Sequence, residues 1–130
     1  MSLGGSYSQA MNDAVMAASS KVMFFLAAGN ESTDAATRSP ASANGVNIYT
    51  ISAMSQGDNW AFYSNWGTPI DYCEPGSSIS SLWKNGGYKT ISGTSMATPH
   101  AAGIALLGLI STDGTVNDDP DGNPDRIGVH

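Results

Sequence analysis

Residues 91–103 read Ile-Ser-Gly-Thr-Ser-Met-Ala-Thr-Pro-His-Ala-Ala-Gly, and the chain stays almost entirely small or apolar from Ser95 to Ile110. A segment that is apolar on every side predicts a helix inside the protein, and Pro99 lies near its start, where a helix tolerates proline. Ser95 then lies where a strand or turn gives way to this helix. Free N–H groups and the positive end of the helix dipole would point toward its hydroxyl. A negative charge forming beside Ser95 would be favoured there.

A second informative segment lies upstream. Val22–Ala28 runs without a polar residue, which indicates a parallel strand covered on both faces, and Gly29 and Asn30 follow it directly. In open α/β sheets the carboxyl ends of parallel strands form the crevice where ligands and chemistry lie. The position of Asn30 therefore indicates that it lies at the edge of the sheet where a functional site would form.

The other segments complete an α/β pattern. Ser6–Ser20 has apolar residues at helical intervals, with Ser6 and Gln9 at capping-box spacing. Ile48–Met54 has the β-branched content of a strand. The sequence therefore predicts an α/β fold with a mostly parallel sheet, flanking helices and a buried central helix after Ser95. A further short strand and a hairpin are expected at residues 70–73 and at residues 79–83 and 88–91.

Composition limits the class of protein. The 130 residues are 41% hydrophobic and 12% charged, which suits one globular domain without an internal linker. The net charge is −6 and the five basic residues are scattered, so nucleic acid is an unsuitable partner. The longest apolar run is far shorter than the roughly 20 residues of a membrane helix, so no membrane association is expected. The single cysteine, Cys73, excludes an internal disulfide and is interpreted as a buried structural thiol.

Residues 111–130 differ in composition from the rest. They are rich in Asp, Gly and Pro, which predicts an acidic, loop-rich or disordered tail. Oxygen ligands alternate at Asp119, Asp121, Asn123 and Asp125, much as in a calcium loop, although the prolines and the glycine position depart from the EF-hand pattern. We expect no cofactor, with calcium binding in this loop as the weaker alternative.

The Gly-Thr-Ser-Met-Ala core of residues 93–97, with the Pro-His that follows, resembles the nucleophile motif of the subtilase family of serine proteases. Phe24–Asn30 resembles the subtilase strand that ends in the oxyanion-hole asparagine. The resemblance covers residues 1–110 and implies the C-terminal portion of a catalytic domain, with an incomplete subtilisin-like fold. It implies a serine endopeptidase that hydrolyses peptide bonds through an acyl-enzyme on Ser95, with Asn30 stabilising the oxyanion.

The opening residues extend this resemblance. Met1–Gly5 is similar to the family strand that lines the specificity pocket. Ser2, Leu3 and Gly4 would then offer backbone groups to a peptide or protein substrate, and Ala28 with Gly29 would form the facing wall of the pocket. The family also implies an extracellular protein.

The general base is the part that the sequence does not supply. In subtilases a histidine oriented by an aspartate precedes the serine, but the two histidines here are His100 and His130. His100 lies about 140° around the helix from Ser95 and about 7.5 Å along it, and is interpreted as a buried structural residue. We therefore expect a fragment that is inactive alone. Its uncovered apolar surfaces and sheet edge predict self-association, or association with a missing N-terminal half.

Two alternatives remain. The chain could be a non-catalytic fragment of a protease fold that binds an extended peptide or self-assembles. A nucleotide-binding α/β domain is less compatible, because no glycine-rich phosphate loop follows the first strand.

Overall fold

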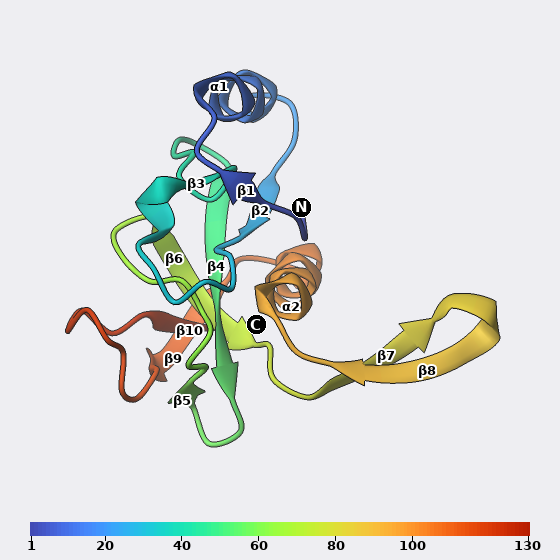
Figure 1. Ribbon diagram of the computed structural model, residues 1–130. Helices are drawn as coiled ribbons and strands as arrows, with labels where there is room; N and C mark the ends of the chain where they lie inside the picture. The colour runs from blue at the N-terminus through green and yellow to red at the C-terminus, as the bar shows by residue number, and fades with distance from the viewer.

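The computed structural model describes residues 1–130 (Figure 1). The chain contains ten strands and two α-helices, together with two short 3-10 helices, Ala35–Thr37 and Lys84–Gly86. In chain order the elements are β1 (Gly5–Ser6), α1 (Gln9–Ala18), β2 (Phe24–Ala27), β3 (Arg38–Ser39), β4 (Ile48–Ser55), β5 (Asn59–Trp60), β6 (Ile70–Pro75), β7 (Ile79–Trp83), β8 (Gly87–Ile91), α2 (Thr94–Leu107), β9 (Ser111–Thr115) and β10 (Arg126–Val129).

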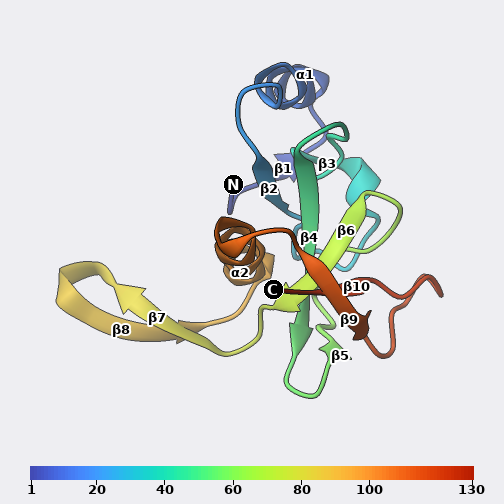
Figure 2. The ribbon, with the colours of Figure 1, turned by 180° about the vertical axis from the view of Figure 1, so that it is seen from behind.

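A six-stranded sheet forms the centre of the molecule. Its strand order is β2-β4-β6-β10-β9, and β5 pairs with the end of β4. The β2–β4, β4–β6 and β6–β10 pairs are parallel, whereas β9 runs antiparallel to β10. Helix α2 covers one face and lies against β2, β4 and β6, while α1 lies at one end of the sheet (Figures 1 and 2). The predicted α/β class with a mostly parallel sheet is confirmed.

The core is divided between the two faces of the sheet. On the α2 face, Ile51 and Ala53 of β4 pack with Ala97 and Ala101 of the helix. Alternate residues of the same strands point to the opposite face because side chains in a strand alternate. There Leu26 and Ile48 pack against Val15 of α1, while Met54, Cys73, Val116 and Ile127 form a separate cluster. Cys73 is fully buried, as expected from the sequence.

Helix α2 is covered along only one side in this chain. Its buried residues are Thr94, Ala97, Thr98 and Ala101, and none lies in the last six residues of the helix. Leu106 and Leu107 near its end are 89% and 70% exposed. The sequence predicted a helix surrounded by protein, and the sheet supplies only one of the surfaces that such a helix can pack against. Neither helix has both the length and the apolar character that a membrane crossing requires.

Helix α1 begins two residues later than its sequence pattern predicted. Its N-cap is Ser8, whose Oγ accepts a hydrogen bond from the Met11 N–H at 3.4 Å. Ser6 instead lies in β1, opposite Arg38 of β3. Gln9 bonds the side chain of Asp13 at 2.8 Å and takes no part in a capping box. Tertiary pairing of β1 thus decides which serine caps the helix.

The last twenty residues differ from the sequence-based expectation of a loop-rich or disordered tail. The segment contains β9 and β10, and β10 pairs in parallel with β6 through Ile127 and Cys73. Val116 and Ile127 are buried with Met54. A few apolar residues spaced between acidic ones are enough to complete the sheet, because backbone hydrogen bonds join β10 to β6 and to β9. Residues between the two strands form the acidic loop that composition indicated.

Strands β7 and β8 form the predicted hairpin. They pair antiparallel from Ile79–Ile91 to Trp83–Gly87. The hairpin projects away from the body of the molecule beside the start of α2 (Figure 1). Most of its residues are exposed. The hairpin forms one wall of a groove, and no other strand or helix packs against the opposite side of the hairpin.

Candidate active site

Ser95 is the second residue of α2, and the helix begins beside the end of β2. The N-cap is Gly93, whose φ of 151° is a conformation that side chains rarely adopt. Gly93 carries no side chain to cap the helix. As the second helical residue, Ser95 has a backbone N–H without an intrahelical acceptor. The free N–H and the positive end of the helix dipole therefore lie at its hydroxyl.

Pro99 links this helix to the start of the chain. Sequence reasoning placed Pro99 in the first helical turn, but it lies five residues after Thr94, inside the helix. A proline there has no N–H to bond the carbonyl of Ser95, four residues earlier. Ser2 Oγ donates to that carbonyl at 2.9 Å, and Ser95 Oγ donates to the Ser2 carbonyl at 3.3 Å. The proline thus releases an acceptor that holds Ser2 beside Ser95.

Asn30 lies at the end of β2 with its amide oriented by Thr94. Asn30 Oδ1 accepts from the Thr94 backbone N–H at 2.8 Å and from Thr94 Oγ1 at 3.1 Å. An amide has one acceptor oxygen and one donor NH2, so this arrangement leaves Nδ2 without a partner in the chain. Gly29 N–H donates to Thr94 Oγ1 at 3.1 Å, which ties the strand end to the helix start a second time.

Asn30 and Ser95 line one small cavity of about 70 Å³. Gly4, Ala28 and Gly29 form part of its wall, so the structure brings these sequence-predicted residues together with the serine and the asparagine. Leu3 does not line the cavity and is half-exposed, and Ser2 contacts the site through its bonds to Ser95. The opening segment lies along β2, because the Ala27 N–H donates to the Met1 carbonyl at 3.2 Å.

Sequence reasoning assigned no role to Asn65, which organises the loop that carries Asn30. Asn65 is fully buried. Its Oδ1 accepts from the N–H groups of Glu31 (3.0 Å) and Thr33 (3.1 Å), and its Nδ2 donates to the Ala28 carbonyl (2.8 Å) and to Glu31 Oε2 (2.7 Å). A Cβ on Gly29 would lie 2.3 Å from Asn65 Nδ2, so only glycine fits there. No local sequence signal distinguishes Asn65 from a surface asparagine.

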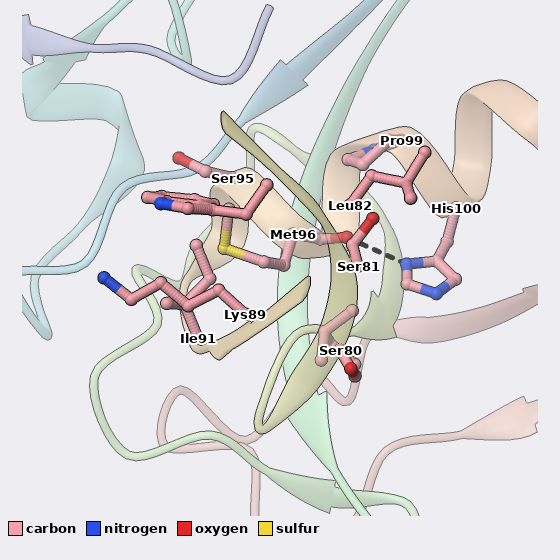
Figure 3. A pocket seen from close by; sticks show the side chains of 11 residues that line it. Ser80, Ser81, Leu82, Lys89, Ile91, Ser95, Met96, Pro99 and His100 are labelled. Atoms are coloured by element: carbon pink, nitrogen blue, oxygen red, sulfur yellow. Dashed lines mark hydrogen bonds between the residues drawn. The ribbon is translucent and has the colours of Figure 1, made fainter. Parts of the chain in front are cut away.

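A larger groove of about 390 Å³ separates the hairpin from α2 (Figure 3). Ser95 and Met96 line it from the helix, opposite Leu82 and Trp83 of β7. Lys89 Nζ lies 4.6 Å from the centroid of the Trp83 ring, a cation–π geometry. This groove is mainly apolar and opens onto the exposed side of α2.

Neither histidine is hydrogen-bonded to Ser95. His100 Nδ1 bonds the Met96 carbonyl of its own helix at 2.8 Å (Figure 3), and His130 Nε2 bonds the Leu107 carbonyl at the far end of α2 at 3.0 Å. The interpretation of His100 as buried is wrong, because its side of the helix is uncovered and the residue is exposed. The Ser95 hydroxyl therefore has a carbonyl partner and no basic one.

Several buried titratable groups lie away from Ser95, at β4, β6 and β10. Burial raises the pKa of Glu74 to about 8, and its Oε1 has no hydrogen-bond partner. Burial also raises the pKa of Asp125 to about 7, although Ser52 Oγ donates to its carboxyl at 2.6 Å. Burial raises the pKa of Cys73 to about 12, so the thiol stays protonated.

Acidic side chains of the 111–130 loop bond mainly to their own backbone. Asp119 accepts from the N–H groups of Asp121 and Asp125, and Asp121 accepts from the Asn123 N–H. No group of three or more His, Cys, Asp or Glu side chains is arranged to hold a metal ion. Calcium binding by this loop stays a prediction.

A mostly parallel sheet with a serine at the N-terminus of its covering helix, beside a side-chain amide at the end of a strand, defines a class of α/β scaffold with a serine-containing cleft. Comparison with known proteins identifies the family. Residues 1–113 match the subtilase family of peptidases, and the chain belongs to that family.

Individual relatives agree with this assignment. Over 111 residues the chain is 53% identical to alkaline serine exoprotease A of Vibrio alginolyticus, a match that covers 84% of this chain and 20% of the relative. It is 47% identical over 119 residues to the subtilisin-like serine protease Pen ch 13 of Penicillium rubens, covering 91% and 29%. A cold-adapted subtilisin-like serine proteinase superimposes with a TM-score of 0.89 and 40% identity, covering 98% of this chain and 52% of that structure. The chain thus spans about half of a solved relative and less than a third of these curated ones.

Proposed function

We propose that this chain is the part of a subtilisin-type serine endopeptidase that carries the nucleophile, Ser95, and one oxyanion donor, Asn30. The observation that carries the proposal is the fixed amide of Asn30. Thr94 holds its oxygen with two hydrogen bonds, so the amino group stays available in the cavity that Ser95 also lines. Two donors would then face the position where a peptide carbonyl becomes negatively charged.

The proposed reaction proceeds through an acyl-enzyme. A base removes the proton of Ser95 Oγ as the oxygen attacks the carbonyl carbon of the scissile peptide bond. The backbone N–H of Ser95 and Nδ2 of Asn30 donate to the resulting oxyanion. The carbon–nitrogen bond then breaks, the amine leaves with the proton held by the base, and water hydrolyses the ester to restore Ser95. No step requires a cofactor.

The substrate in this proposal is an extended segment of a peptide or protein. Backbone groups of Ser2, Leu3 and Gly4 would pair with it, and Ala28 and Gly29 would form the wall facing its side chain. Support comes from the position of the opening segment, which Ser2 holds beside Ser95. Support also comes from the family, whose relatives are named proteases.

In this proposal the general base comes from outside the chain, which is inactive by itself. The partner would be the remainder of a catalytic domain, and a second copy would cover the same surfaces in its absence. The exposed side of α2 supports this, because Pro99 and Ala102 line a cavity of about 400 Å³ against Phe24 and Phe25 of the edge strand β2. Sedimentation should therefore show self-association, and a monodisperse monomer over a wide concentration range would contradict it.

We also infer an extracellular location. Support comes from a relative that is named alkaline serine exoprotease A. Detection of the protein in the medium of its native cells would support the inference, and confinement to the cells would contradict it.

A fluorophosphonate probe tests the proposed chemistry, because an activated serine oxygen displaces its fluoride and forms a phosphonate ester, whereas an unactivated serine reacts slowly. The chain alone should label slowly, and added imidazole, a small-molecule base, should accelerate labelling in proportion to its concentration. Ser95→Ala should abolish the label. Asn30→Ala should slow it strongly, since loss of one oxyanion donor costs about 10²- to 10³-fold in turnover, a magnitude taken from subtilisin itself.

The second candidate function is a non-catalytic peptide-binding or self-assembling fragment. The lack of any histidine bonded to Ser95 favours it for this chain alone. If imidazole leaves Ser95 unlabelled, or if Asn30→Ala labels as fast as the unaltered chain, the catalytic proposal fails and this alternative stands.

A further inference from the structure

The hairpin β7–β8 and helix α2 form a basic segment in an acidic protein. Residues 75–112 contain no Asp or Glu, and their two lysines, Lys84 and Lys89, both lie in the hairpin. The chain as a whole has a net charge of −6, with eleven acidic and five basic residues. All eleven acidic residues therefore lie elsewhere, and the hairpin and the remainder of the molecule have opposite charge.

The end of the hairpin is apolar and aromatic as well as basic. Leu82 and Tyr88 lie opposite each other on the two strands and are 74% and 78% exposed. Trp83 is 41% exposed, with the Lys89 ammonium over its ring. Adjacent residues of a strand point to opposite faces, so both faces of the hairpin end carry large apolar side chains. We call Leu82, Trp83, Lys84, Tyr88 and Lys89 the arm tip.

The loop between β9 and β10, residues 116–125, has the complementary character, and we call it the acidic loop. Asp118 and Asp121 are exposed there, and so are Pro120 and Pro124. The ion pair between Arg38 and Glu31 is the only one in the structure. The lysines of the arm tip and the aspartates of the acidic loop therefore have no partner of opposite charge within the chain.

The arm tip and the acidic loop lie on opposite sides of the molecule. The hairpin projects to one side of the central sheet and the acidic loop to the other, in both views of the ribbon (Figures 1 and 2). The two surfaces cannot meet within one chain. They can meet only when two copies align with the arm tip of one at the acidic loop of the other.

We propose that the arm tip docks on the acidic loop of a second copy of this chain, so that copies associate head to tail. The lysines of the tip pair with the exposed aspartates of the loop. The rings of Trp83 and Tyr88 pack on its two prolines, as aromatic side chains do in proline-binding grooves. Charge and apolar character match at once, which favours a second copy over a purely anionic partner. The inference goes beyond the proposed function and uses neither Ser95 nor the uncovered side of α2.

Salt concentration affects this contact in a defined way. Two copies of net charge −6 repel each other at long range. At about 0.15 M salt, exposed charges more than about 8 Å apart are largely screened, so the general repulsion falls while close pairs keep part of their attraction. A contact between two different surfaces leaves a free tip at one end and a free loop at the other. The assembly is therefore an open chain and not a closed dimer.

Carbodiimide cross-linking tests the contact directly, because the reagent joins an ammonium to a carboxylate that touches it. Unlabelled and ¹⁵N-labelled full chains are mixed in equal amounts, cross-linked, digested and analysed by mass spectrometry. Linked peptides that contain both isotopes come from two copies. We expect mixed-isotope links from Lys84 or Lys89 to Asp118 or Asp121. Their yield should fall several-fold at about 1 M NaCl, where screening acts beyond about 3 Å.

Two variants measure the contribution of each surface. Lys84→Gln with Lys89→Gln gives the arm variant, and Asp118→Asn with Asp121→Asn gives the loop variant. Asparagine keeps the oxygen that accepts from the Asn123 N–H, so the loop retains its internal bond. In sedimentation velocity each variant alone should associate about fivefold more weakly than the unaltered chain, because each exposed ion pair contributes little.

Mixing the two variants tests the head-to-tail arrangement. The intact tip of the loop variant meets the intact loop of the arm variant, so an equimolar mixture should recover the affinity of one contact. Association should then stop at pairs, because the other tip and the other loop are both altered. Lys21→Gln with Arg126→Gln is the matched control, since it removes the same charge from exposed positions elsewhere and should associate as the unaltered chain does.

The outcomes separate this inference from the proposed function. Links from the arm lysines to other carboxylates, an absence of mixed-isotope links, or a mixture that associates no better than either variant would overturn it. Association that neither salt nor the variants change would place the contact on the uncovered side of α2, which overturns this inference and supports the self-association proposed above. Failure of imidazole to promote labelling of Ser95 would overturn the proposed chemistry and leave the head-to-tail contact standing.

Discussion

Replacing Asn65 by alanine tests whether one buried amide holds the loop that carries Asn30. The substitution removes four hydrogen bonds, to the N–H groups of Glu31 and Thr33, the Ala28 carbonyl and Glu31 Oε2. Glu31 is exposed and its groups can return to water, whereas Ala28 is fully buried and its carbonyl cannot. A buried polar group left without a partner costs about 1–3 kcal/mol. With a partial loss at Thr33, the expected decrease in the free energy of unfolding is about 3 kcal/mol.

Urea unfolding followed by tryptophan fluorescence measures this change. A loss of about 3 kcal/mol lowers the folding equilibrium constant about a hundredfold, and it shifts the urea midpoint by about 2 M for a chain of this size. Asn44→Ala is the matched control, because Asn44 is exposed, and it should leave the midpoint nearly unchanged. If Asn65→Ala shifts the midpoint no more than Asn44→Ala, the network does not hold the loop. Imidazole-assisted labelling of Ser95 should also slow in Asn65→Ala, measured under conditions where the variant is folded.

Three further predictions concern the sheet. Gly128→Ala should destabilise the chain by about 1–3 kcal/mol, because its Cβ would lie 2.4 Å from Glu74 Oε1, whereas Gly87→Ala meets no atom within 4 Å and should have little effect in the same urea assay. Burial raises the pKa of Glu74 and of Asp125, so the folded chain binds more protons than the unfolded chain between about pH 4 and about pH 8. The free energy of unfolding should therefore fall as the pH rises through this range, and Glu74→Gln should make that fall smaller. A free energy of unfolding that rises with pH in this range would contradict the prediction. Cys73, with a pKa of about 12 and no exposure, should react with a thiol reagent only in urea, so modification of the folded chain would refute its burial.

Local pattern was sufficient for the elements that bury continuous apolar runs. The strand at Phe24–Ala27, the hairpin at Ile79–Ile91 and the helix that starts beside Ser95 all follow from residues adjacent in the chain. The elements that pattern missed depend on distant partners. Strand β10 contains only four residues and exists because β6 offers its edge, and α1 starts at Ser8 because Ser6 pairs with Arg38.

The site divides in the same way. The residues proposed for catalysis, Ser95 and Asn30, were recognisable from contiguous motifs and their order. The residues that orient them were not. Thr94 and Asn65 act through hydrogen bonds to residues that lie up to 65 positions away, and such contacts leave no periodic pattern in the sequence.

The sequence by itself therefore determined the α/β class, the family resemblance and the candidate nucleophile, because burial periodicity and short motifs are properties of neighbouring residues. The tertiary structure decided which way the Asn30 amide faces, which charged residues line the cavity beside Ser95, and which side of α2 remains uncovered. Each of these depends on hydrogen-bond geometry and packing between segments that meet only after the chain has folded.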